Sequence, residues 1–151
     1  MRFEQVKEVL AYVEDLHDRI ARSYATLGEH AVETRTRMLL DYMSARELSL
    51  AETVHSFIDE SPAIALREYD PFSYDDGDLR RLLADTLAPE ATPEQVLDLG
   101  MHVRDWFLTF FVKAAEKSRN SEQRALFNSL RDRGEREKQK LARNANMLGD
   151  F

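Results

Sequence analysis

The chain has 151 residues, a net charge of -7 from 28 acidic and 21 basic residues, and no cysteine. This length suits a single domain with a sizeable core, and the acidic balance argues against unaided binding to nucleic acid or to an anionic membrane. The lack of cysteine excludes disulfides, thiolate catalysis and zinc-finger chemistry, and it fits a reducing cytoplasm, where we expect the protein to act.

The apolar segments predict no association with a membrane. The N-terminal segment MRFEQVKEVL is charged and amphipathic, unlike a secretory signal peptide. The longest apolar stretch, residues 106–112, is far shorter than the roughly 20 residues that span a bilayer. We therefore expect neither a membrane nor a nucleic acid among the partners.

Apolar residues recur every three or four positions through the first 60 residues, which is the pattern of amphipathic helices. One helix is predicted over residues 3–27, ended by Gly28, with an apolar face of Val6, Val9, Leu10, Val13, Leu16, Ile20, Tyr24 and Leu27. A second is predicted over residues 33–59, with an apolar face of Leu39, Leu40, Met43, Leu50, Ala51, Val54 and Ile58. Pro62 cannot continue a helix, so this first hairpin covers residues 3–59.

Residues 60–92 form a long connection between two hairpins. Residues 69–72 and 75–78 have turn composition, and residues 78–87 suit a short helix capped by Asp78. Thr92 followed by Pro93 is typical of a helix start, with threonine as N-cap and proline at the first helical position. The second hairpin is predicted over residues 93–147, with helices over 93–118 and 121–147 and Ser121 as the cap of the last helix.

The two hairpins match each other at a constant offset, which pairs Leu10 with Leu97 and Tyr24 with Phe111. Identities are few, but the apolar faces agree in phase over both helices. No segment alternates as a β-strand does. The sequence therefore predicts an all-α fold, an internally repeated antiparallel four-helix bundle with a crossover between its second and third helices.

Four polar residues interrupt the apolar faces of the four predicted helices: His17, Glu47, Arg104 and Glu137. The separation of His17 from Glu47 equals that of Arg104 from Gly134, which precedes Glu137 by about one turn. Charged groups are rarely buried unless they are paired or bound to metal. We therefore predict that the four side chains form one internal polar cluster, rather than lying singly at the rim.

The segments IARSYATLGEHAVETRTRMLLDYMSARELSL and LTFFVKAAEKSRNSEQRALFNSLRDRGEREKQKL resemble the repeated hairpins of the rubrerythrin branch of the ferritin-like family. In that family the first helix of each hairpin supplies a glutamate seven residues before an aromatic residue. The second helix supplies an ExxH motif. The resemblance implies a ferritin-like bundle whose core positions once held a di-iron site.

The resemblance also implies that this site is degenerate. His17 and Arg104 occupy the two glutamate positions, counted back from Tyr24 and Phe111. The two ExxH positions hold Glu47 with Leu50, and Gly134 with Glu137, as the sequence shows. Arginine, leucine and glycine cannot replace the ligands, so the dinuclear site is expected to be lost and no cofactor is expected.

Charge balance supports the same hypothesis. Several buried carboxylates repel one another unless cations neutralise them. Here the two carboxylates of Glu47 and Glu137 would meet Arg104 and a protonated His17, so the net charge of the cluster is zero without metal. A guanidinium also binds carboxylates through several N–H donors. The alternative is a mononuclear iron or manganese site made by His17, Glu47 and Glu137, with Arg104 orienting a bound anion or peroxide.

Two other patterns have a structural explanation. Glu52 and His55 also spell ExxH, but they lie about 140° and 80° from the inward direction of Glu47, so we expect a surface pair. The predicted third helix carries a second apolar face that includes Val103, Trp106, Phe107 and Phe110. Either the crossover or a second subunit should cover that face, and we expect a homodimer.

The function predicted from these features is a non-catalytic assembly or interaction module built on a ferritin-like bundle. The alternative is a metal-binding protein or oxidoreductase that uses the mononuclear site. A helical binding module unrelated to ferritins is the third possibility. The sequence contains no nucleophilic triad, phosphate-binding loop or glycine-rich nucleotide motif.

Overall fold

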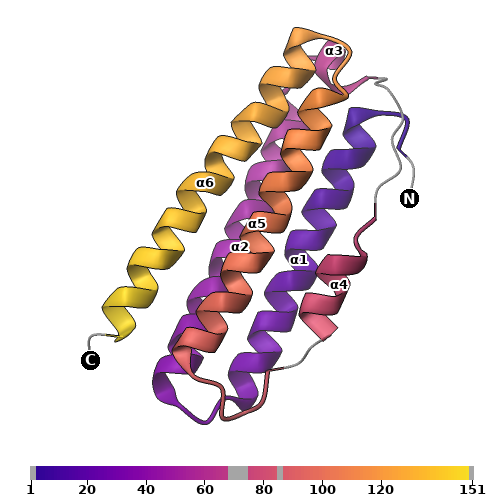
Figure 1. Cartoon of the computed structure of the whole chain (residues 1–151). Coiled ribbons are helices and arrows are strands. Elements are labelled where there is room, and N and C mark those ends of the chain that lie inside the picture. The colour runs from indigo at the N-terminus through magenta and orange to yellow at the C-terminus, as the bar shows by residue number, and fades with distance from the viewer. Residues whose placement is uncertain (1–2, 68–74, 85–86, 150–151) are drawn as a thin grey trace.

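The computed structural model describes residues 3–67, 75–84 and 87–149 (Figure 1). Within these residues the chain is helical and has no β-strand, so the all-α prediction is confirmed. The four long helices are α1 (Val6–His30), α2 (Thr34–Glu60), α5 (Pro93–Glu116) and α6 (Ser121–Gly149). Two short helices, α3 (Ala63–Leu66) and α4 (Gly77–Ala84), lie between α2 and α5 in the sequence. None of the described helices is long and apolar enough to cross a membrane.

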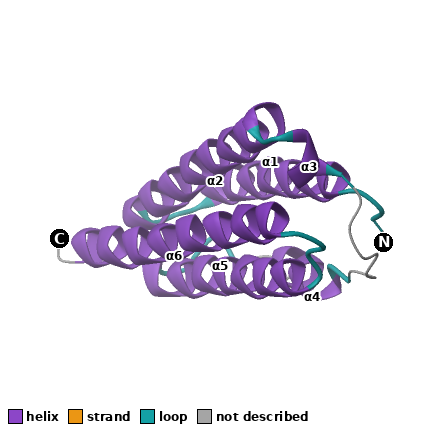
Figure 2. Cartoon of the chain, turned by 90° about the horizontal axis from the view of Figure 1, so that it is seen from above, coloured by secondary structure: helices purple, strands orange, loops and turns teal. Residues whose placement is uncertain are grey.

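The four long helices lie side by side, and successive helices in each hairpin run in opposite directions (Figures 1 and 2). α1 packs along α2 and α5 along α6, while α2 also contacts both α5 and α6. The short helix α3 sits at the end where α6 begins, whereas α5 begins at the opposite end (Figure 1). The connection between the hairpins therefore starts at one end of the long helices and finishes at the other.

Local capping chemistry explains the helix boundaries that were predicted correctly. α2 ends immediately before Ser61 and Pro62, as expected from the missing N–H of proline. At the start of α5, the Thr92 side chain accepts from the backbone N–H of Gln95 at 3.3 Å, and the Gln95 side chain accepts from the backbone N–H of Thr92 at 3.0 Å. This reciprocal pair is a capping box, and Pro93 follows at the first helical position.

The prediction that Gly28 ends α1 is wrong. The helix continues to His30, and Ala31 ends it with extended backbone while its N–H donates to the carbonyl of Gly28 at 3.3 Å. Gly28 instead allows close approach of α2, because a Cβ atom there would lie 3.1 Å from Asp41 Oδ1. What matters at this position is that glycine has no side chain, which leaves room for α2; the backbone freedom of glycine is not needed here.

Two predicted helix caps are also wrong. Asn120, not Ser121, caps α6: its Oδ1 accepts from the backbone N–H of Gln123 at 2.8 Å. In α4, Gly77 is already helical, and its N–H donates to Asp75 Oδ1 at 2.8 Å. Asp78 therefore lies within the first turn. The turn predicted at residues 69–72 lies outside the described residues.

The second apolar face of α5 is covered within one chain. Val103, Phe107 and Phe110 are buried, and half-buried Trp106 stacks on Phe110 with ring centroids 5.7 Å apart. α4 packs against α5 and buries Leu79. The prediction that these aromatic residues and Val103 form a subunit interface is therefore wrong, because three of the four have no exposed surface to offer a second chain.

Replacing Phe110 by glutamate is expected to lower the free energy of unfolding by at least about 3 kcal/mol. The phenyl ring is 2% exposed, and the substitution removes its packing and buries an unpaired charge. Urea denaturation followed by circular dichroism measures the effect. Val112→Glu on the same helix is the matched control, since Val112 is 40% exposed and should tolerate the charge. Equal stability of the two variants would contradict the observed packing.

Candidate functional site

The candidate site is a buried network of three of the four predicted polar residues. His17 from α1, Glu47 from α2 and Arg104 from α5 are each no more than 5% exposed. Glu47 is at its centre: Oε2 lies 2.6 Å from His17 Nδ1, and Oε1 accepts from Arg104 Nη2. Helical periodicity brings these residues together, because each lies on the inward face of its own helix.

Phe107 forms an aromatic wall of the network. Its ring stacks on the His17 imidazole with centroids 4.4 Å apart, and the Arg104 guanidinium carbon lies 5.0 Å from its centroid. A guanidinium over an aromatic face is attracted by the ring quadrupole. Because the ring also excludes water, it strengthens the electrostatic attraction between Arg104 and Glu47.

Burial and pairing set the charges in the network. Burial alone would raise the pKa of Glu47, but Arg104 and His17 together hold it below its usual value. Burial lowers the pKa of His17, and this outweighs the attraction of Glu47 for an imidazolium. We therefore assign a neutral His17 that donates its Nδ1 hydrogen to Glu47. The predicted charge balance counted a protonated His17, whereas here another cation supplies that charge.

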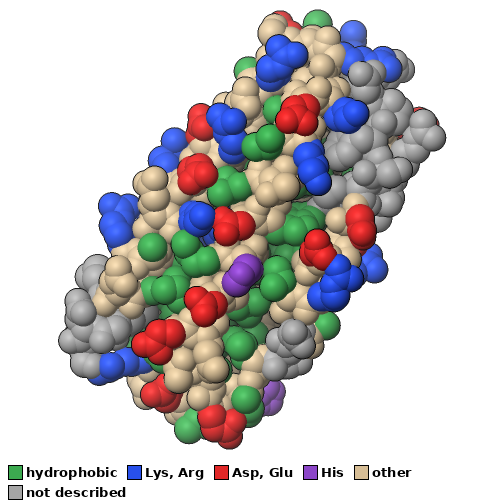
Figure 3. Space-filling model, viewed as in Figure 1, with side chains coloured by type: hydrophobic (Ala, Val, Ile, Leu, Met, Phe, Trp, Pro, Cys, Tyr) green, Lys and Arg blue, Asp and Glu red, His purple; other side chains and the backbone are tan. Residues whose placement is uncertain are grey.

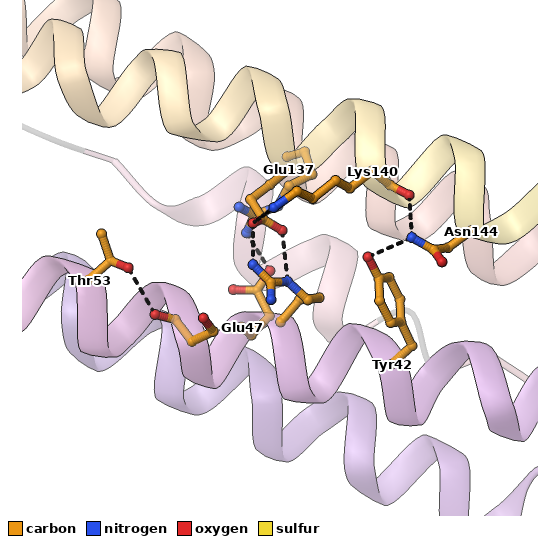
Figure 4. A network of polar contacts seen from close by, with 9 residues as sticks. Tyr42, Glu47, Thr53, Glu137, Lys140 and Asn144 are labelled. Atoms are coloured by element: carbon orange, nitrogen blue, oxygen red, sulfur yellow. Dashed lines mark hydrogen bonds and ion pairs between the residues drawn. The ribbon is translucent and has the colours of Figure 1, made fainter.

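The additional cation is Arg46, which helical periodicity did not assign to the cluster. Its Nε donates to Glu137 Oε2 at 3.0 Å, and its Nη2 donates to Glu137 Oε1. Lys140 Nζ lies 3.6 Å from the same carboxylate (Figure 4). Glu137 therefore does not bond to the three residues of the network. Arg46 was missed because it lies about 100° around the helix from Glu47, and only its long side chain reaches the carboxylate.

Both ion pairs line one small cavity between the helices. The space in it that the centre of a water molecule can reach is about 20 Å³. Besides Arg46, Glu47, Arg104 and Glu137, its lining consists of Tyr24, Tyr42, Met43, Leu50, Gly100 and Leu141. Of the two lost ligand positions, Leu50 borders this cavity, whereas a Cβ atom on Gly134 would lie 3.0 Å from Leu108 Cδ2.

These residues do not fit a metal ion. Both Glu47 oxygens already accept hydrogen bonds from protein donors, and Arg104 adds a positive charge beside them. Among the described residues, no three His, Cys, Asp or Glu side chains gather around a possible metal position. The predicted mononuclear set of His17, Glu47 and Glu137 does not gather around one position here, because Glu137 pairs with Arg46 instead.

The ExxH sequence formed by Glu52 and His55 lies on the surface, as predicted. Glu52 and His55 are both exposed. His55 Nδ1 lies 3.0 Å from Glu14 Oε1, and its Nε2 lies 3.2 Å from Asp59 Oδ2. Exposed pairs of this kind contribute little to stability.

Acidification below pH 6.5 is expected to destabilise the protein through His17. Burial lowers the pKa of His17 in the folded chain, and the ordinary value of 6.5 applies when it is unfolded. The unfolded chain therefore binds the proton more readily, so this stability is complete above pH 6.5 and is lost as the pH falls toward the folded pKa. Urea denaturation at several pH values, compared between wild type and His17→Gln, measures it. An unchanged pH slope in the variant would contradict the assignment.

No family model, curated protein or solved structure matched the chain. Membership of the ferritin-like family therefore stays a prediction that rests on the two hairpin segments. The buried network and its cavity stand on their own geometry.

Proposed function

We propose that the chain is a ferritin-like four-helix bundle in which ion pairs have replaced a dinuclear metal site, and that it acts as a non-catalytic assembly or interaction module. The observation that supports this most is the bonding of Glu47. Its two carboxylate oxygens are bound by His17 and Arg104, and the residue is only 3% exposed. A carboxylate engaged in this way is poorly suited to binding a metal ion, because the Arg104 charge would lie beside that ion.

Two arginine side chains supply the positive charge that metal ions would supply in the family that the chain resembles. Arg104 neutralises Glu47, and Arg46 neutralises Glu137, so each buried carboxylate has its own cation. A divalent ion entering the cavity would meet the positive charge of Arg104 at short range in a low-dielectric environment. The charges of the core therefore balance without metal, and we infer that the bundle works through its surface rather than through its core.

Elemental analysis tests the metal-free core. Wild type is purified without chelator, loaded with iron or manganese and desalted, and far less than one ion per chain is expected to be retained. His55→Ala is the matched control, since any weak uptake should decrease when this exposed histidine is removed. One tightly held ion per chain that His17→Gln abolishes would overturn the proposal and restore the mononuclear alternative.

The proposed assembly is a cytoplasmic homodimer, and it is tested separately. The chain mass is 17.5 kDa. Light scattering at micromolar concentration should therefore give about twice this mass. A monomer at all concentrations would remove the homodimer and leave binding to another protein as the remaining form of the interaction hypothesis. The metal analysis would be unaffected by that result.

A further inference from the structure

The hydroxyl of Tyr24 has an environment that the ion-pair network does not explain. Tyr24 is 1% exposed, and its hydroxyl oxygen is the one buried side-chain nitrogen or oxygen atom without a hydrogen-bond partner among the described residues. The side chain lines the cavity beside Glu47 and Arg104. Because buried polar groups nearly always have a partner in protein or ordered water, this hydroxyl indicates a bound molecule in the cavity.

The cavity has room for a molecule of one or two heavy atoms. The centre of a water molecule can reach about 20 Å³ there, and one water needs roughly 10–15 Å³ by the same measure. Met43 and Leu141 are among the apolar side chains that line this space. A larger ligand would have to displace these side chains.

The hydrogen-bonding groups of the lining define the chemistry of that molecule. Burial raises the pKa of Tyr24, so its hydroxyl stays protonated and can donate. Each Glu47 oxygen accepts one bond from the protein and has a second lone pair, while Arg104 has N–H donors beyond its bond to Glu47. A molecule that both accepts and donates hydrogen bonds satisfies all three groups.

The charges of the lining favour an uncharged occupant. Glu47 with Arg104 and Glu137 with Arg46 are two neutral pairs. An anion would be repelled by Glu47, and a cation would be repelled by Arg104. We propose that the cavity between Tyr24, Glu47 and Arg104 is a binding site for one small uncharged hydroxylic molecule, the size of water, which accepts from Tyr24 and donates to Glu47.

The ion pair of Arg46 with Glu137 borders this site and is itself partly exposed to solvent. Figure 4 shows Glu137 on α6 pointing toward α2, where Glu47 and Tyr42 lie. The Arg46 side chain is 35% exposed, so one side of the pair is in water while its other side borders the cavity.

Crystal structures of wild type soaked separately in bromide and in rubidium test the site and its charge preference. Electron density for one small molecule within about 3.0 Å of Tyr24 Oη is expected, without anomalous signal from either ion. An empty cavity, or a direct bond from Tyr24 to Glu47, would overturn the proposal. A bromide or rubidium peak in the cavity would also overturn it, since the occupant would then be an ion.

Thermal unfolding of Tyr24→Phe gives an independent test. If the hydroxyl is bound to a molecule, the variant should melt about 2–4 °C below wild type, which is the shift typical of one lost hydrogen bond at this chain length. If the hydroxyl is unpaired, its removal should raise the melting temperature, and that result contradicts the proposal.

Gly100→Ala provides the matched background for this measurement. A Cβ atom there would lie 2.7 Å from Met43 Cε and 2.9 Å from Leu141 Cδ2, so these two side chains would have to shift. All three residues line the cavity, and the added methyl group is expected to take up part of its space. Once the cavity is filled in this way, Tyr24→Phe should no longer lower the melting temperature. The same decrease in both backgrounds would show that the hydroxyl acts without a bound molecule.

Discussion

Replacing Arg104 by methionine is expected to lower the free energy of unfolding by about 3–5 kcal/mol, the cost of breaking a buried ion pair from one side. Methionine keeps the apolar stem of the side chain but leaves Glu47 charged and buried, with His17 as its remaining partner. Urea denaturation at pH 7 measures the loss. Arg46→Met is the matched control, and it should cost only about 1 kcal/mol, because Arg46 is partly exposed and Lys140 stays near Glu137.

A second substitution identifies the cause of that loss. Adding Glu47→Gln to Arg104→Met should recover more than half of the lost stability, because the unpaired buried charge is then removed. In Arg104→Met alone, burial is expected to raise the pKa of Glu47 above its unfolded value. Stability from the protonated carboxyl is then present at low pH and is lost as the pH rises, so the defect should shrink on acidification. A defect independent of pH, without rescue, would show that packing alone is responsible.

The features that the sequence predicted correctly depend on short-range chemistry or on helical periodicity. The capping box at Thr92 and the stop before Pro62 each involve neighbouring residues only. Periodicity also placed His17, Glu47 and Arg104 on inward faces, because the helix fixes side-chain direction regardless of what it packs against. The meeting of these three side chains could therefore be predicted without knowing the contacts between helices.

The features that were missed depend on tertiary packing. Glu137 lies near the predicted cluster, but its partner was decided by whether Arg46 could reach it from outside the inward face. The protonation of His17 depends on how deeply it is buried, which a single sequence does not specify. Similarly, the apolar face around Phe110 required a cover, and only the packing of α4 against α5 distinguishes a crossover from a second subunit.

Substituting Arg104→Glu together with Leu50→His is expected to create uptake of one divalent cation per chain. Leu50 and Arg104 both border the cavity, next to Glu47. The two changes would place a second carboxylate and a second imidazole beside His17 and Glu47, a set suited to zinc, manganese or iron. Without metal, the variant should be less stable than wild type, because two buried carboxylates repel each other and the arginine charge is gone.

The same pair of substitutions distinguishes a remodelled metal site from an ordinary polar core. Saturating zinc or manganese should raise the melting temperature of the double variant, since an ion at 100 times its dissociation constant contributes about 2.7 kcal/mol. Leu50→His alone should show no such rise in melting temperature, because Arg104 still donates a hydrogen bond to the Glu47 carboxylate. Adding Gly134→Glu should give no further gain, since Gly134 faces Leu108 rather than the cavity. If only the triple variant bound metal, α6 would have to be rotated from its position here, and the family resemblance would describe the core better than the observed contacts do.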